Sequence, residues 1–341
     1  MLAKGAGNDV TFGQSSPFLS YIPSGTYYAN LSTLMGSPDD AATFQKNVLD
    51  GLDTSVTNLC PSKDPGVIEG YKALYSVNAQ KFLNSPIAQV ELLFFTLGNI
   101  GGGDQQTLSI QIALQHPYSQ GRLYITSNNA FDDPALDPQY LSHSADVVLM
   151  RQGLKLARKI AATSPLKDVL GAEVAPGPAV TSDDAIDDYV ANGIATEFHP
   201  ANTLAMLPRS QGGVVDAKLR VYGLQNVRVV DASIFPLQFA AHVRICFHLG
   251  LAPVLTLWLC QMQWPVYSLA EHASQIIRDF HNGVPDPDDS SNSNNPPSGG
   301  NNGTNPNDGG NNNSGGAPSL SAPSVLTSVI ALFFAALVVV L

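Results

Sequence analysis

The chain has 341 residues, of which 44% are hydrophobic, and this is enough for a sizeable globular core. Its net charge is −11 at neutral pH. Such an acidic chain lacks the basic surface that nucleic-acid binding requires, so composition excludes a nucleic-acid partner and favours a small-molecule substrate. The three cysteines, Cys60, Cys246 and Cys260, show no spacing typical of a metal site, and we expect none.

Helices and strands are predicted from apolar periodicity and from capping and turn residues. The expected helices cover 41–52, 69–82, the segment after a Ser144 cap, the segment from a Thr181 or Ser182 cap to Gly193, and 266–280. The expected strands cover 108–114, 122–126, 214–215 and 227–230. The segment 87–97 is mostly apolar, with a single charge at Glu91, and suits a buried strand or a short core helix equally well.

A glycine-rich run, Gly98 and then Gly101 to Gly103, follows that apolar segment. The run lacks the GxGxxG spacing of a nucleotide-binding loop and does not open a helix. We therefore interpret it as a structural loop.

The end of the chain has the composition of a tethered surface protein. Residues 284–316 are rich in Asn, Gly, Ser and Pro, and too few are apolar to offset the entropy of ordering, so this segment is predicted to be a disordered stalk. Residues 317–341 have the pattern of a glycosylphosphatidylinositol (GPI) anchor signal, and a tail-anchored membrane helix is the alternative. Both predict an extracellular or cell-surface protein attached to a membrane, although the N-terminus lacks a secretory signal pattern.

An unusual apolar insertion covers 245–264. It is long enough to suggest a membrane span, but Pro253 interrupts it and Arg244, His248 and Gln261 weaken that interpretation. A translated intron or similar artefact is the first explanation for it, and a buried or membrane-facing insertion is the second.

The most informative stretch runs from Phe198 to His242. It contains, in order, aromatic-His-Pro, Thr-Leu-Ala-Met, Gly-Val-Val-Asp, Leu-Arg-Val-Tyr-Gly, Arg-Val-Val-Asp-Ala-Ser and a final His. This order of blocks resembles the C-terminal signature of the glucose-methanol-choline (GMC) oxidoreductases. A weaker resemblance continues upstream through His116-Pro117 and downstream through Pro265-Val266-Tyr267.

The resemblance implies an α+β fold, with an antiparallel sheet platform and helices on one face. It also implies that residues 1–165 are a substrate-binding region and that residues 166–283 are the C-terminal GMC region. This second region would contain the C-terminal portion of an incomplete FAD-binding α/β domain. The implied activity is oxidation of a CH–OH group, with flavin adenine dinucleotide (FAD) as the hydride acceptor. No side chain can accept a hydride, so a cofactor must do so.

The resemblance assigns roles to seven residues. It implies that His199 is the general base and that His242 hydrogen-bonds the substrate oxygen, and histidine suits proton transfer near neutral pH. It places Asp231 and Ala232 near the flavin pyrophosphate. The remaining cofactor-binding residues, near the flavin ring system, are Phe235, Pro236 and Gln238. Histidines 116, 143, 248, 272 and 281 are interpreted as structural.

No strand–GxGxxG–helix element occurs in the sequence, so the chain resembles the second half of an enzyme. We expect a truncated form that binds flavin weakly or not at all by itself. The competing hypothesis is a non-enzymatic GPI-anchored surface protein with a degenerate oxidoreductase domain. A hydrolase using Ser233, His242 and Asp231 is a third hypothesis, disfavoured because no GxSxG motif surrounds any serine.

Overall fold

The computed structural model describes residues 25–97, 107–224, 226–240, 263–284 and 336–340. The chain divides into two compact units, Met1–Ala273 with Phe333–Leu341, and Ser274–Leu332. Every helix and strand described below belongs to the first unit, except for the C-terminal part of the last helix.

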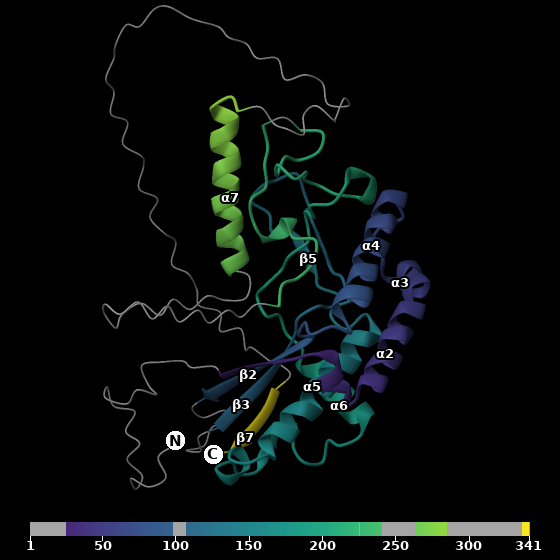
Figure 1. The fold of residues 1–341 in the computed structure, drawn as a ribbon, viewed down its shortest axis with the longest axis vertical. Coiled ribbons are helices and arrows are strands. Elements are labelled where there is room, and N and C mark those ends of the chain that lie inside the picture. The colour runs from purple at the N-terminus through teal and green to yellow at the C-terminus, as the bar shows by residue number, and fades with distance from the viewer. Residues whose placement is uncertain (1–24, 98–106, 225, 241–262, 285–335, 341) are drawn as a thin grey trace, which may run out of the picture. The chain divides into compact units, whose positions relative to one another are not determined.

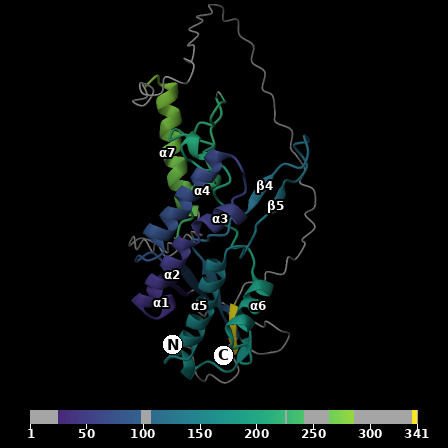
Figure 2. The ribbon, with the colours of Figure 1, turned by 90° about the vertical axis from the view of Figure 1, so that its right-hand side faces the viewer.

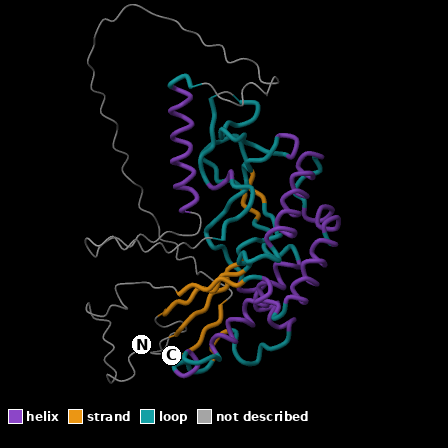
Figure 3. The backbone as a smooth tube through the Cα atoms, viewed as in Figure 1, coloured by secondary structure: helices purple, strands orange, loops and turns teal. Residues whose placement is uncertain are grey.

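A five-stranded antiparallel sheet forms the base of the first unit (Figures 1 and 3). Its spatial order is β1, β2, β3, β7 and β6. These strands are β1 (Gly25–Ala29), β2 (Val90–Leu97), β3 (Thr107–Leu114), β7 (Ala336–Val340) and β6 (Glu173–Ala175). The fold is therefore a mixture of helices and antiparallel sheet, and the predicted α+β class is confirmed.

One face of the sheet is the centre of the hydrophobic core. Alternate residues of β2 and β3 point to this face, and Val90, Leu92, Ile110 and Ile112 are all buried there. Helix α5 (Ser144–Ala161) covers this face. The helix and the sheet lie so close together that a Cβ atom added at Gly153 would be 2.6 Å from Cγ2 of Ile112. The absence of a side chain at this glycine lets the helix approach the sheet closely.

The first helices are capped by the residues that local sequence favours. They are α1 (Leu31–Met35), α2 (Pro38–Asp50), α3 (Leu52–Leu59), α4 (Pro65–Val77) and a π-helical turn at Asn78–Phe82. Asn30, Ser37 and Asp64 each accept a hydrogen bond from a backbone N–H of the following first turn. The helices predicted at 41–52 and 69–82 are confirmed, and the ambiguous segment 87–97 forms a strand.

Two further helices follow. Ser182, one of the two predicted caps, caps α6 (Asp183–Gly193). Gly283 follows α7 (Gln263–His281) in the left-handed conformation with φ +68°. The predicted cap of α5 is wrong by one residue. His143 is the cap, because its Nδ1 atom accepts a hydrogen bond from the N–H of Ala145 at 3.1 Å.

The predicted strands at 214–215 and 227–230 do not form as continuous strands. Val215 makes isolated bridges to Met206 and to Val221, and Arg220 makes one to Arg228. Each of these apolar runs is short, and each makes only single bridges to neighbouring segments, so no continuous ladder of hydrogen bonds forms. The remaining regular elements are a hairpin of β4 (Arg122–Tyr124) and β5 (Ala135–Asp137), and 3-10 turns at Leu166–Asp168, Arg209–Gln211 and Ala232–Ile234.

Strand β7 comes from the apolar segment that the sequence predicts to be an anchor signal or hydrophobic tail. Within the sheet it pairs with β3 on one side and with β6 on the other. The rest of 317–341, the stalk at 284–316 beyond Val284, and 245–262 of the insertion lie outside the described residues. Within the described ranges, no helix combines the length and apolar character of a membrane span. Membrane attachment and a cell-surface location stay predictions.

Candidate functional site

His199 lies on the loop that follows α6, between two residues with unusual backbone conformations. Phe198 has a φ of +61° and Asn202 has a φ of +73°, and both values fall in the left-handed region. For Phe198 this conformation costs about 1–2 kcal/mol, whereas asparagine adopts it readily. Strain of this kind persists only where the surrounding structure imposes it, and it is concentrated at functional sites.

The loop containing His199 is joined to the Asp-Ala-Ser segment through main-chain hydrogen bonds. The N–H of Leu204 donates to the carbonyl oxygen of Ser233 at 2.9 Å, and the N–H of Met206 donates to that of Ile234 at 2.8 Å. Two segments separated by about thirty residues in the sequence therefore run together as one unit.

Two side chains add further connections between the same segments. The side-chain amide of Gln238 donates to the carbonyl oxygen of His199 at 3.1 Å. In the other direction, the side-chain amide of Asn202 donates to the carbonyl oxygen of Pro236. Two of the predicted cofactor-binding residues, Pro236 and Gln238, thus contact the loop that carries the predicted base.

The imidazole of His199 is half-buried, and its Nδ1 atom contacts the carbonyl oxygen of Glu197. A carbonyl oxygen can only accept a hydrogen bond, so Nδ1 must carry the proton. The neutral ring therefore has its lone pair on Nε2. This nitrogen is the one that can accept a proton from a substrate.

The Asp231 turn is held by its own side chain. Oδ1 of Asp231 accepts a hydrogen bond from the N–H of Ser233 at 2.8 Å and caps the short 3-10 turn that follows. The hydroxyl of Ser233 also donates to this carboxylate. A catalytic serine would instead donate to a histidine, so the contact offers no support to a hydrolase.

The remaining predicted residues of this segment differ in exposure. Ala232 is half-buried and Phe235 is buried, with its ring packed edge-on against that of Phe239 at a centroid distance of 4.9 Å. The ring of Phe235 thus packs within its own segment. The exposed ring of Phe239 is the one that faces outward.

His116 lies beside the same loop, and sequence reasoning interpreted it only as structural. It is buried, its Nε2 atom has no hydrogen-bond partner among the described residues, and its ring lies 5.2 Å from that of Phe82. Burial lowers the pKa of His116 to about 4, and the backbone of Gln238 partly opposes this shift. His116 therefore contacts the segment that positions His199. The sequence signal that could have linked His116 to this loop is the His-Pro dipeptide, which occurs at both 116 and 199.

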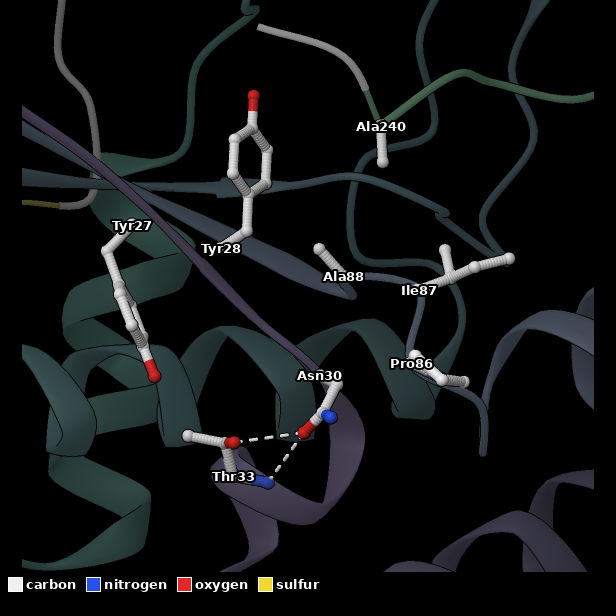
Figure 4. A pocket seen from close by; sticks show the side chains of 8 residues that line it. All are labelled: Tyr27, Tyr28, Asn30, Thr33, Pro86, Ile87, Ala88 and Ala240. Carbon is white, nitrogen blue, oxygen red and sulfur yellow. Dashed lines mark hydrogen bonds between the residues drawn. The ribbon is translucent and has the colours of Figure 1, made fainter.

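A cavity of about 500 Å³ lies at the edge strand β1 (Figure 4). Its lining residues are Tyr27, Tyr28, Asn30, Thr33, Pro86, Ile87, Ala88 and Ala240. The rings of Tyr27 and Tyr28 point to opposite sides of the strand, and the oxygen of Asn30 is occupied by hydrogen bonds from Thr33. Ala240 is the last described residue before His242, so the segment leading to the second histidine reaches this cavity.

The second predicted catalytic residue, His242, lies outside the described residues. Its pairing with His199 stays a prediction. Among the residues that the structure describes, no cluster of three or more His, Cys, Asp or Glu side chains could hold a metal ion, and Cys60 is buried and free.

Comparisons with known proteins identify the family. The family model described as GMC oxidoreductase matches residues 117–247. GMC oxidoreductase family protein Mala s 12 of Malassezia sympodialis is 37% identical over 69% of this chain. Alcohol dehydrogenase [acceptor] of Pseudomonas putida is 43% identical over 35% of this chain. A solved fungal aryl-alcohol oxidase is 26% identical, with a TM-score of 0.59 over 75% of this chain.

This chain carries the C-terminal part of a GMC oxidoreductase. It spans 36% of the Malassezia relative, 22% of the Pseudomonas enzyme and 38% of the aryl-alcohol oxidase. The family match covers the His199 loop and the Asp231 segment together. The two elements that the structure joins are therefore both part of the GMC region.

Proposed function

We propose that this chain supplies the proton-transferring part of an FAD-dependent oxidoreductase that acts on CH–OH groups, with His199 as the general base. The observation that carries the proposal is the contact between Nδ1 of His199 and the carbonyl oxygen of Glu197. It leaves Nε2 as the proton acceptor on a loop that hydrogen bonds hold against the Asp231 segment.

Removing two electrons from an alcohol requires a hydride to leave carbon and a proton to leave oxygen. When bound, the flavin supplies the hydride acceptor. In our proposal, Nε2 of His199 takes the hydroxyl proton, and the carbonyl oxygen of Glu197 stabilises the imidazolium that results. The side-chain amide of Gln238 fixes the backbone of His199 and so the direction of its ring. His242 is proposed to hydrogen-bond the same substrate oxygen.

The residues fit only part of an FAD molecule. The segment 231–240 offers backbone and aromatic groups beside His199 where a flavin ring and its first phosphate could lie. The adenosine diphosphate part needs a glycine-rich turn opening a helix, and none of the described helices begins on a GxGxxG turn. In our proposal, the remainder of the cofactor site comes from the part of the relatives that this chain does not match.

The proposal is tested by fusing the full chain behind the N-terminal part of the Malassezia relative that it does not match. We expect the fusion to show flavin absorbance and to be reduced anaerobically by an alcohol such as benzyl alcohol. His199→Gln should lower the rate of flavin reduction by about 100- to 10,000-fold, the usual contribution of general-base catalysis, at unchanged flavin content.

His272→Gln is the matched control, because this histidine is exposed on α7. It should leave the rate unchanged. A His199→Gln fusion that is reduced as fast as the unmodified fusion would remove the proposed role. The chain expressed alone should show little or no flavin absorbance, and a flavin spectrum together with alcohol oxidation would refute the need for a second half.

A further inference from the structure

One sequence motif in the described part of the chain has no role in the proposed function. Residues 30–32 are Asn-Leu-Ser, which matches the acceptor pattern for N-linked glycosylation, Asn-X-Ser/Thr with X other than proline. The pattern also occurs at Asn302 and Asn312, and both of these lie outside the described residues. A three-residue pattern is common by chance, so the surroundings of Asn30 decide its meaning.

Asn30 has a fixed position at the surface. It lies between β1 and α1 and is half-buried, and the next residue, Leu31, is fully buried. Helix α1 packs beside α2 and α5 (Figure 2). The core therefore anchors the main chain at Asn30, while part of its side chain stays accessible.

The side-chain oxygen of Asn30 is engaged in hydrogen bonds, and its nitrogen is not. The N–H and the hydroxyl of Thr33 donate to Oδ1 at 3.0 Å and 2.9 Å. A backbone N–H can only donate, so the atom that faces Thr33 must be the oxygen of the amide. Nδ2 points away from Thr33 and makes no hydrogen bond with a described residue (Figure 4). Because an N-linked sugar is attached to Nδ2, it would leave the cap of α1 intact.

Helix capping accounts for Asn30 but not for the rest of the motif. The hydroxyl of Ser32 makes no hydrogen bond with a described residue, and only its carbonyl oxygen is used, by the N–H of Gly36 at 3.0 Å. The acceptor pattern requires a hydroxyl at this position. Glycosylation thus explains a side chain that the helix does not need.

The cavity at β1 offers room for the sugar. Asn30 is one of its lining residues, and its volume is about 500 Å³. Cavities of about 300–1,000 Å³ hold drug-sized ligands, so a single sugar ring fits within this one. Tyr27 and Tyr28 line the same cavity, and none of its lining residues is charged. Rings with an apolar body and a polar hydroxyl suit a sugar, which has apolar C–H faces and polar edges.

We propose that Asn30 carries an N-linked oligosaccharide and that its first sugar ring lies in the cavity at β1. The donor class is an oligosaccharide joined to a lipid through a diphosphate, as found in the secretory pathway. In the transfer, the bond between C1 of the first sugar and the diphosphate oxygen breaks, and a bond between C1 and Nδ2 forms. One proton leaves Nδ2 and the lipid diphosphate leaves C1, so no atom is oxidised or reduced. The cell-surface location predicted from the sequence would bring the chain to this donor.

The test is expression of the full chain in a yeast behind a yeast signal sequence, so that the chain meets the donor. The secreted protein is treated with peptide-N-glycosidase in water labelled with oxygen-18. This enzyme converts a glycosylated asparagine to aspartate, so the mass of the sugar-free peptide that contains Asn30 should rise by about 3 Da. A secreted chain whose Asn30 peptide shows no such rise would overturn the proposal.

Two variants remove the acceptor without removing the cap. Ser32→Ala deletes only the hydroxyl of the pattern, and Asn30→Asp keeps a capping oxygen but has no Nδ2. Both should lose the sugar at residue 30 completely, with an unchanged circular dichroism spectrum. Thr33→Ala is the matched control, because it removes one hydrogen bond to Oδ1, leaves the pattern intact and should keep the sugar. A sugar that persists at residue 30 in Ser32→Ala would contradict the role of the motif.

The position of the first sugar ring is tested by the rate of its release. The enzyme must reach the bond at Nδ2, so release from the native chain should be at least about tenfold slower than release from the denatured chain. Equal rates would show that the sugar lies outside the cavity, and this part of the proposal would be wrong. These measurements need neither flavin nor an alcohol, so their outcome is independent of the proposed function.

Discussion

Asp146 offers the sharpest test of the buried electrostatics. It lies in the first turn of α5, is buried, and accepts hydrogen bonds from the N–H groups of Tyr118 at 2.9 Å and Ser119 at 2.8 Å. Burial raises the pKa of Asp146 to about 6, although these hydrogen bonds favour the charged form. The folded protein therefore holds a proton here at a pH where the unfolded chain has released it.

His116 has the opposite effect, because burial lowers its pKa to about 4. Between about pH 4 and 6.5 the unfolded chain binds a proton at His116 that the folded protein does not, so stability rises with pH. For Asp146 the folded protein binds the extra proton between about pH 4 and 6, so stability falls with pH. Each shift corresponds to about 3 kcal/mol, and the two effects largely offset each other.

The substitution Asp146→Asn removes only the carboxylate contribution. We expect the free energy of unfolding of this variant to rise by about 3 kcal/mol more than that of the unmodified chain between pH 4 and pH 6. The lowered pKa of His143, which is also buried, adds to the rise in both proteins. The amide oxygen of the variant cannot accept both backbone hydrogen bonds, which lowers the free energy of unfolding by an amount that does not depend on pH. The difference in pH slope is therefore the informative quantity.

The assay is urea denaturation of both proteins at pH 4, 5, 6 and 7, followed by circular dichroism and tryptophan fluorescence. Asp133→Asn is the control, because this carboxylate is exposed on the hairpin, and its curve should parallel that of the unmodified chain. Equal pH slopes for Asp146→Asn and the unmodified chain would show that Asp146 has an ordinary carboxylate pKa in the folded state, and the argument from burial would fail.

Two further predictions concern the segment that positions His199. Gly213→Ala should lower the free energy of unfolding by about 3 kcal/mol, because its Cβ would lie 1.8 Å from the carbonyl oxygen of Leu207 and the backbone must move. Gly223→Ala is the control in thermal denaturation, because no atom lies within 4 Å of a Cβ added there. Only its left-handed φ of +79° opposes the substitution, at a cost of about 1 kcal/mol. Equal losses of stability in the two variants would contradict the steric argument. Gln238→Leu removes the hydrogen bond to His199, worth about 1 kcal/mol, so amide hydrogen exchange around His199 should accelerate about fivefold. Unchanged exchange there would mean that the amide of Gln238 does not hold the loop.

Local features were predictable where the interaction spans only a few residues. Ser182 and the acidic residues after it specify the start of α6, and Asp39 with Asp40 mark the first turn of α2, because capping and dipole effects act within one helical turn. The segment 87–97 was ambiguous for the same reason. A buried strand and a buried helix segment are both apolar, and only pairing with β1 and β3 selects the strand.

The sequence by itself determined the family and the capped helices, and it singled out His199 as the predicted base, because these inferences depend on residue order and on contacts within a few positions. Tertiary structure decided that Gln238 and Asn202 join two distant segments, and that His116 lies buried against the same loop. It also decided that the residues of the β4–β5 hairpin remain exposed. Burial and long-range hydrogen bonds depend on which segments meet in space, and the pattern of residues along a chain does not carry that information.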